Sequence, residues 1–148
     1  MKLSPVGLQI RLMTNDDYRD VYRLSKQMNW DGACYDEFEF TRIYKKFFNS
    51  EEREAFVATV INRVIGFVTV YYFEAFHYFG KAAIIQELVV TEEFRGRGVG
   101  KALVEFVKEK TREKHCHGLE IATDMWQSGT KSFYEKCGFI SNPFMLAN

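Results

Sequence analysis

Proline and cysteine are scarce in this chain, and what little there is excludes several architectures. The two prolines, Pro5 and Pro143, lie near the ends of the 148 residues, so neither interrupts an internal helix or strand. The three cysteines, Cys34, Cys116 and Cys137, form an odd number without paired spacing. That pattern excludes a disulfide framework and indicates free thiols in a reducing compartment.

Long apolar runs and clustered metal ligands are also lacking. The longest run, residues 55–61, is far too short to cross a bilayer, and residues 1–5 contain no apolar core of a secretion signal. His115-Cys116-His117 is a poor metal site, because three adjacent residues cannot point the same way on a helix or strand. We therefore expect a cytoplasmic protein with no metal and no membrane association.

The chain has no excess of either charge. Lys plus Arg and Asp plus Glu each number 20, so the formal net charge is zero. Sequence-independent binding to nucleic acid needs an excess of basic residues, so a nucleic-acid partner is not expected. With 47% apolar residues and no linker or repeat, residues 1–148 are predicted to form one domain with a substantial core.

The apolar periodicity predicts alternating groups of strands and helices. Alternating or β-branched runs predict strands over 8–13, 55–61, 64–73, 82–90, 119–123 and 139–146. Thr14 and Asp17 have capping-box spacing at the start of a first helix that ends near Asn29. Further helices are predicted over 40–48, with one buried face, and over 99–107 and 130–137. The order βααβββαβαβ is typical of a mixed α/β (α+β) fold with one central sheet.

The most informative segment is a buried strand that runs through a glycine-rich loop into a helix. The first turn of a helix offers unpaired N–H groups and the positive end of the helix dipole, and glycine allows close approach to the backbone. Fixed positive charge lies in the same loop. These features favour a pyrophosphate site, made by Arg95, Gly96, Arg97, Gly98, Gly100 and Lys101.

This loop has three other interpretations: two known phosphate-binding motifs and a simple turn. The dinucleotide fingerprint G-x-G-x-x-G is excluded, because the three glycines alternate and no acidic residue follows at the expected distance. The nucleoside-triphosphate loop is excluded because Ala102 stands where Ser or Thr must bind magnesium. A tight turn with solvated charges remains as the alternative.

Two motifs together resemble the GCN5-related N-acetyltransferase (GNAT) superfamily. Arg95-x-x-Gly98-x-Gly100 is similar to its pyrophosphate motif, and Phe133-Tyr134-Glu135-Lys136-Cys137-Gly138-Phe139 to its C-terminal signature. The resemblance implies a mostly antiparallel sheet with a splayed parallel strand pair, flanked by helices. It also implies an acetyl-CoA-dependent N-acetyltransferase that acts on a small-molecule or peptide amine by direct transfer, and a homodimer.

The resemblance also implies where acetyl-CoA binds. Pantetheine would pair with the strand backbone, and a backbone N–H near Val89 would polarise the thioester carbonyl. The loop would hold the pyrophosphate, and the C-terminal motif would add contacts. The residues so implied are Leu88, Val89, Val90, Arg95, Gly96, Arg97, Gly98, Val99, Gly100, Lys101, Gln127 and Phe133. Gln127 stands where many relatives carry Asn.

Two catalytic residues are predicted. Tyr134 matches the family's general acid, although it could instead be a core aromatic residue. Glu87 is the predicted base, because alternation places it on one face with Ile85 and Val89, where burial raises a carboxyl pKa. A structural carboxylate paired with Arg or Lys is the alternative, and Glu120 is a second candidate base.

The acceptor site is the least defined. The family usually builds it from the loop between the first two helices, the central strands and the C-terminal strands. This nominates Met28, Trp30 and Tyr72, and Glu120 is a further candidate substrate-binding residue. A catalytically silent acyl-CoA-binding or sensor module of the same fold is the alternative function. It would bind acetyl-CoA equally well without releasing coenzyme A.

Overall fold

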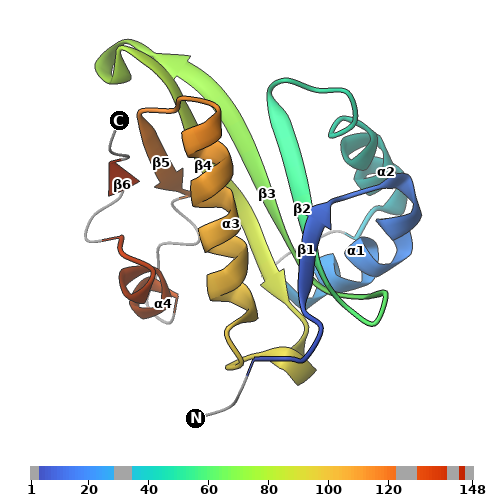
Figure 1. Ribbon diagram of the computed structural model, residues 1–148. Coiled ribbons are helices and arrows are strands. Elements are labelled where there is room, and N and C mark those ends of the chain that lie inside the picture. The colour runs from blue at the N-terminus through green and yellow to red at the C-terminus, as the bar shows by residue number, and fades with distance from the viewer. Residues whose placement is uncertain (1–3, 29–34, 123–129, 140–143, 146–148) are drawn as a thin grey trace.

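Six strands form one mixed sheet in the order β1-β2-β3-β4-β5-β6 (Figure 1). The computed structural model describes residues 4–28, 35–122, 130–139 and 144–145. The strands are β1 Gln9–Leu12, β2 Arg53–Val60, β3 Arg63–Ala75, β4 Gly80–Val90, β5 Gly118–Ile121 and β6 Phe144–Met145. The helices are α1 Tyr18–Ser25, α2 Glu37–Lys45, α3 Val99–Glu113 and α4 Lys131–Lys136. Single 3₁₀ turns cover Asn15–Asp17, Lys26–Met28, Phe76–Tyr78 and Glu92–Phe94. The predicted element order and fold class are confirmed.

Neighbouring strands are antiparallel except for β4 and β5, which are parallel. Their pairing runs from Ala83 opposite Leu119 to Ile85 opposite Ile121, and the N–H of Ala122 then donates to the carbonyl of Ile85 at 2.9 Å. β4 continues to Val90, and no described strand pairs with residues 86–90 on that side. The expected parallel pair is present, and its described pairing covers only the first part of β4.

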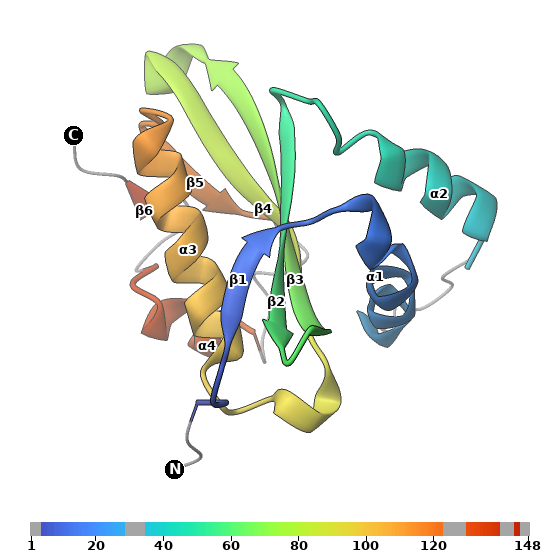
Figure 2. The ribbon, with the colours of Figure 1, turned by 45° about the vertical axis from the view of Figure 1, so that its right-hand side comes forward.

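Helices cover both faces of the sheet. Figure 2 shows α3 and α4 on one side and α1 and α2 on the other. Two buried clusters follow this division. The α3 side packs Phe56, Val68, Ile85, Leu103, Val107 and Phe139, and the α1–α2 side packs Val21, Leu24, Tyr44, Phe67 and Val89.

A β-bulge at Gln86 changes which way β4 side chains point. Thr69 is opposite Glu87, but the next pair is Val70 with Ile85, so Gln86 is an extra residue in β4. Ile85 therefore packs on the α3 side, whereas Glu87 and Val89 face α1 and α2. The expectation that all three share one face is wrong, because strict alternation breaks at this bulge.

The two N-terminal helices differ slightly from their predicted forms. The predicted capping box of Thr14 and Asp17 is present, with the N–H of Thr14 donating to Oδ2 of Asp17 at 2.7 Å, but it caps the 3₁₀ turn that precedes α1. Helix α2 ends at Lys45. Ile43 is 42% exposed, so the buried face of this helix is narrower than its spacing predicts.

Candidate active site

The glycine loop between β4 and α3 forms one wall of a large cavity. Gly98 has φ of 83°, a left-handed conformation that favours glycine, and α3 begins at the next residue. The cavity has a volume of about 600 Å³. It is lined by the β4 end, the loop, the start of α3 and helix α4: Leu88, Val90, Phe94, Arg95, Gly96, Gly98, Val99, Gly100, Lys101, Thr130, Phe133, Tyr134, Lys136 and Cys137.

The cations of the loop divide into two groups. Arg95 and Lys101 line the cavity, and Lys136 joins them from α4. The Nε of Arg95 donates to the carbonyl of Val90 at 2.9 Å, which ties the loop to the end of β4. Arg97 does not line the cavity; its guanidinium lies 5.1 Å from the centre of the Phe94 ring. Cations beside a helix N-terminus form an anion site of the kind a pyrophosphate needs.

The two sequence motifs meet inside this cavity. A Cβ atom on Gly100 would lie 3.1 Å from Cζ of Phe133, which is tighter than most real contacts. Glycine at position 100 therefore lets the C-terminal motif pack directly on the first turn of α3. The pyrophosphate loop and the Phe133-Tyr134 pair become two walls of one cavity.

Backbone donors on β4 point in alternating directions. The N–H of Thr91 donates to the carbonyl of Ile65 at 2.8 Å, and the N–H of Glu87 donates to Oγ1 of Thr69 at 2.9 Å, so both point toward β3. Alternation gives the N–H of Val89 the same direction. The N–H groups of Leu88 and Val90 therefore point toward the β5 side, where the cavity lies. Leu88 and Val90, rather than Val89, therefore present their N–H groups on the cavity side of β4.

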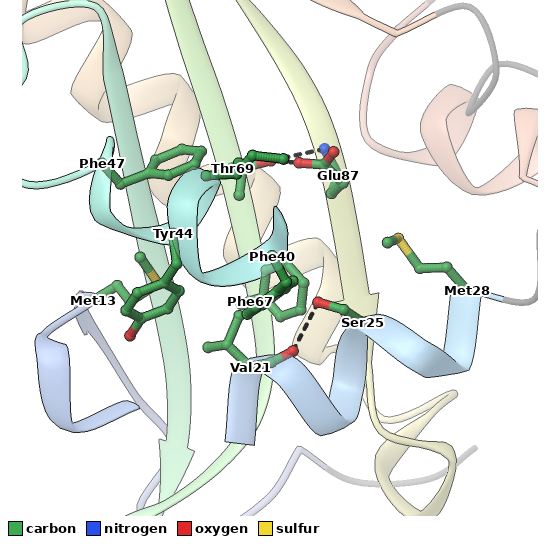
Figure 3. Close-up of a pocket in the computed structure, with 11 residues that line it drawn as sticks. Met13, Val21, Ser25, Met28, Phe40, Tyr44, Phe47, Phe67, Thr69 and Glu87 are labelled. Carbon is green, nitrogen blue, oxygen red and sulfur yellow. Dashed lines mark hydrogen bonds between the residues drawn. The ribbon is translucent and has the colours of Figure 1, made fainter. Parts of the chain in front are cut away.

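Glu87 enters a second, smaller cavity of about 170 Å³ on the opposite face of the sheet (Figure 3). The hydroxyl of Thr69 donates to Oε1 of Glu87 and accepts from the N–H of the same residue. Burial raises the pKa of Glu87 above its ordinary value, and the Thr69 hydrogen bond lowers it by a smaller amount. No Arg or Lys lines this cavity, so its described walls offer no cation for a structural ion pair with Glu87.

Tyr134 is almost completely buried, at 1% exposure, between the rings of Phe133 and Phe139. It also lines the large cavity. Burial raises the pKa of the phenol well above its ordinary value. Tyr134 therefore remains protonated near neutral pH.

The other predicted acceptor residues lie apart from both cavities. The hydroxyl of Tyr72 donates to Oε1 of Glu54 at 2.7 Å, and its ring packs on the α3 side. Glu120 accepts a hydrogen bond from the hydroxyl of Tyr78 at 2.7 Å. Trp30 and Gln127 lie outside the described residues.

Several residues that line the small cavity are not predicted from the sequence. Met28 is a predicted acceptor residue and lines this cavity. Ser25, Thr69 and Phe67 also line it, but the sequence analysis does not predict them as site residues. Thr69 could have been found only by knowing the β3–β4 register, because it becomes a partner of Glu87 across the sheet. Phe40 appeared only as part of the apolar face of its helix.

Comparisons with known proteins agree with this geometry. The sequence profile of the Acetyltransferase (GNAT) family matches residues 15–139. Glucosamine 6-phosphate N-acetyltransferase of Arabidopsis thaliana is 32% identical over 68 residues, which is 46% of this chain and 44% of that protein. The chain spans between 30% and 64% of the length of the curated relatives it matches.

Solved structures show the same fold. The crystal structure of the Arabidopsis thaliana enzyme has a TM-score of 0.74 at 24% identity, covering 95% of this chain and 97% of that one. The aminoglycoside N-acetyltransferase AAC(6')-Iy, solved in complex with CoA, has a TM-score of 0.77 at 18% identity over 95% of this chain and 93% of its own.

Two further properties bear on the site. In the part of the chain that the structure describes, no three His, Cys, Asp or Glu side chains gather in a way that could hold a metal ion. Likewise, none of the described helices is long and apolar enough to span a bilayer. With the family profile covering most of its length and its two motifs joined at one cavity, this chain belongs to the GNAT acetyltransferase family.

Proposed function

We propose that this protein transfers the acetyl group of acetyl-CoA to a primary amine by direct transfer in a ternary complex. One observation carries the proposal. Glu87 and Leu88 are adjacent on β4, yet they line two cavities on opposite faces of the sheet, beyond the point where pairing with β5 ends. An acceptor beside Glu87 and a thioester beside Leu88 would therefore approach each other across β4.

The large cavity fits acetyl-CoA, which supplies an activated acetyl group as a thioester. The amides at the start of α3, with Arg95 and Lys101, would bind the pyrophosphate. The inward-facing N–H groups of Leu88 and Val90 would hold the pantetheine arm as a strand neighbour does. The N–H of Leu88 would also donate to the carbonyl oxygen as negative charge develops there.

Glu87 would act as the base. An ammonium cannot attack until it loses a proton, and a carboxylate with a raised pKa accepts that proton directly or through one water. The amine nitrogen then bonds to the carbonyl carbon, and the carbon–sulfur bond breaks. The hydrogen bond from Thr69 keeps Glu87 oriented toward the cavity.

Tyr134 would donate to the departing sulfur. A thiol comparable to that of cysteine has a pKa of about 8.5, which is lower than the pKa of a phenol. Tyr134 would therefore keep its proton and stabilise the thiolate by a hydrogen bond until the sulfur takes up a proton. Of the two protons that the ammonium loses in all, one balances the proton gained by sulfur. The other is released to solvent.

The test measures binding and turnover separately. Acetyl-CoA is expected to raise the melting temperature by mass action, and an acceptor amine is expected to cause release of free thiol. Stabilisation without thiol release across a broad amine panel would instead favour the sensor alternative. Absence of stabilisation by acetyl-CoA would contradict both functions.

A further inference from the structure

The cavity that receives Glu87 is small and nearly all apolar (Figure 3). Its walls come from the sheet and from both N-terminal helices. The apolar and aromatic members are Met13, Val21, Met28, Phe40, Ile43, Tyr44, Phe47 and Phe67. The remaining described members are Ser25, Thr69 and Glu87.

The hydroxyl donors of this cavity are already engaged. Ser25 Oγ donates to the carbonyl of Val21 at 2.7 Å, and Tyr44 donates to the carbonyl of Thr14 at 2.5 Å. Thr69 donates to Glu87. A sugar placed here would lose water from its hydroxyl groups without gaining a side-chain hydroxyl donor from these described residues, which is unfavourable.

The charge of the cavity is equally restrictive. Glu87 is the single charged group among its described lining residues, and no Lys, Arg or His accompanies it. A phosphate or carboxylate on the acceptor would find no cation among these residues to pair with. A polyamine would bring additional ammonium groups that no second carboxylate among these residues matches.

We propose that the acceptor is a primary amine attached to one ring-sized apolar group, as in an aralkylamine. The volume of about 170 Å³ supports this size, because an engineered apolar cavity of about 150 Å³ in another protein holds benzene. The proposal rests on the proposed function, since it assigns the acceptor of that same site. The amine has two conceivable sources: a free small molecule, or the first residue of a peptide.

A substrate comparison tests the assignment. Free-thiol release is measured with the whole chain, acetyl-CoA and one amine at a time: phenethylamine, glucosamine 6-phosphate, spermidine, and short peptides beginning with Phe or Gly. The expected result is a kcat/KM for phenethylamine, or for the Phe peptide, at least tenfold above the others. The faster of those two identifies the source.

The outcomes are distinguishable. If the phosphosugar or spermidine is the best acceptor, this inference is overturned and the acetyltransferase proposal stands. If the Gly peptide equals the Phe peptide and phenethylamine is no better, the apolar recognition is likewise overturned. If acetyl-CoA stabilises the protein but no amine releases thiol, the proposed function fails together with it.

Two variants on one helix test the cavity itself. Phe40→Ala enlarges the cavity, whereas Phe38→Ala is a matched control at a position that is 78% exposed and does not line it. Phe40→Ala should shift the kcat/KM ratio of naphthylmethylamine to benzylamine at least tenfold toward the larger amine, with Phe38→Ala unchanged. If Phe40→Ala does not fold, Met28→Ala provides the same test from the end of the 3₁₀ turn that follows α1. An unshifted ratio in a folded variant overturns the proposal.

Discussion

The ring of Phe133 packs against the backbone of Gly100, and this contact joins the two motifs of the family at one cavity. Gly100 belongs to the pyrophosphate loop and Phe133 to the C-terminal signature. The residues are far apart in the sequence, yet position 100 has no room for a side chain unless the ring moves. The identity of residue 100 thus affects the position of a wall of the coenzyme site.

Gly100→Ala is therefore expected to weaken acetyl-CoA binding more than it changes stability. Alanine favours a helix by about 1 kcal/mol over glycine, which offsets part of the crowding. The ring of Phe133 must shift, and we expect an acetyl-CoA Kd about tenfold higher. Isothermal titration calorimetry measures this change. Adding Phe133→Leu should recover part of the affinity; a double variant that binds no better than Gly100→Ala would contradict the explanation.

Tyr134→Phe is expected to lower kcat by about 100-fold, the range seen when a hydrogen-bond donor to developing negative charge is lost. The ring contacts with Phe133 and Phe139 are retained, so the melting-temperature increase caused by acetyl-CoA should not change. Tyr78→Phe is the control, because Tyr78 lines neither cavity. Equal kcat values for wild type and Tyr134→Phe would remove this residue from the mechanism.

Glu87→Gln is expected to reduce kcat/KM by about 100-fold or more and to remove the acidic limb of its pH profile. Burial raises the pKa of Glu87, so this limb should lie above the ordinary range of a glutamate. Thr69→Val should move the limb further upward, because the lost hydrogen bond lowers that pKa. Using one amine throughout cancels the titration of the substrate. A variant profile parallel to that of the wild type would argue against Glu87 as the base.

The same carboxyl should make the protein less stable as pH rises. The folded-state pKa of Glu87 is raised, whereas the unfolded-state pKa is about 4.3, so the folded state binds more protons between the two values. Stability is therefore lost as pH rises through that interval. Glu87→Gln should consequently gain stability relative to wild type between pH 4 and pH 7. Urea unfolding at both pH values measures the gain, and exposed Glu92→Gln serves as control.

Asp17 should show the opposite dependence. Burial raises its pKa, but hydrogen bonds from Arg11 at 2.8 and 2.9 Å and from the Thr14 N–H lower it more, so the net shift is downward. Its contribution is present above the unfolded pKa of about 3.9 and is lost as pH falls through the folded pKa.

Asp17→Asn should therefore cost about 1–3 kcal/mol at pH 7 and much less at pH 3. Chemical denaturation at the two pH values gives the difference. Asp20→Asn is a matched control, because the Asp20–Arg23 pair is solvent-exposed and should contribute under about 1 kcal/mol. A cost for Asp17→Asn that is the same at both pH values would contradict the assignment.

The element order could be predicted because it depends on local periodicity and on two motifs. The apolar spacing predicts α3, and the glycine-rich loop before it predicts where α3 begins. The coenzyme cavity was predictable for the same reason, since its walls come from two short segments with recognisable sequences.

Most of the lining of the proposed acceptor cavity could not be predicted, because it depends on long-range register. Thr69 becomes a partner of Glu87 only through the pairing of β3 with β4. The exposure of Ile43 depends on how α2 packs, which the helical spacing alone does not determine. The direction of the Leu88 N–H likewise follows from hydrogen bonds to β3 rather than from any residue type.

Because Gln86 is an extra residue in β4, the orientation of the β4 side chains depends on the number of residues in this strand. A substitution at position 86 leaves the count of residues unchanged, so Glu87 and Ile85 keep their opposite orientations. Deleting the residue would restore even pleating and turn one of them over, placing either a carboxylate in the apolar core on the α3 side or an isoleucine at the wall of the cavity that Glu87 lines. Deletion of residue 86 would therefore change the orientation of β4 side chains, which a substitution at this position would not do.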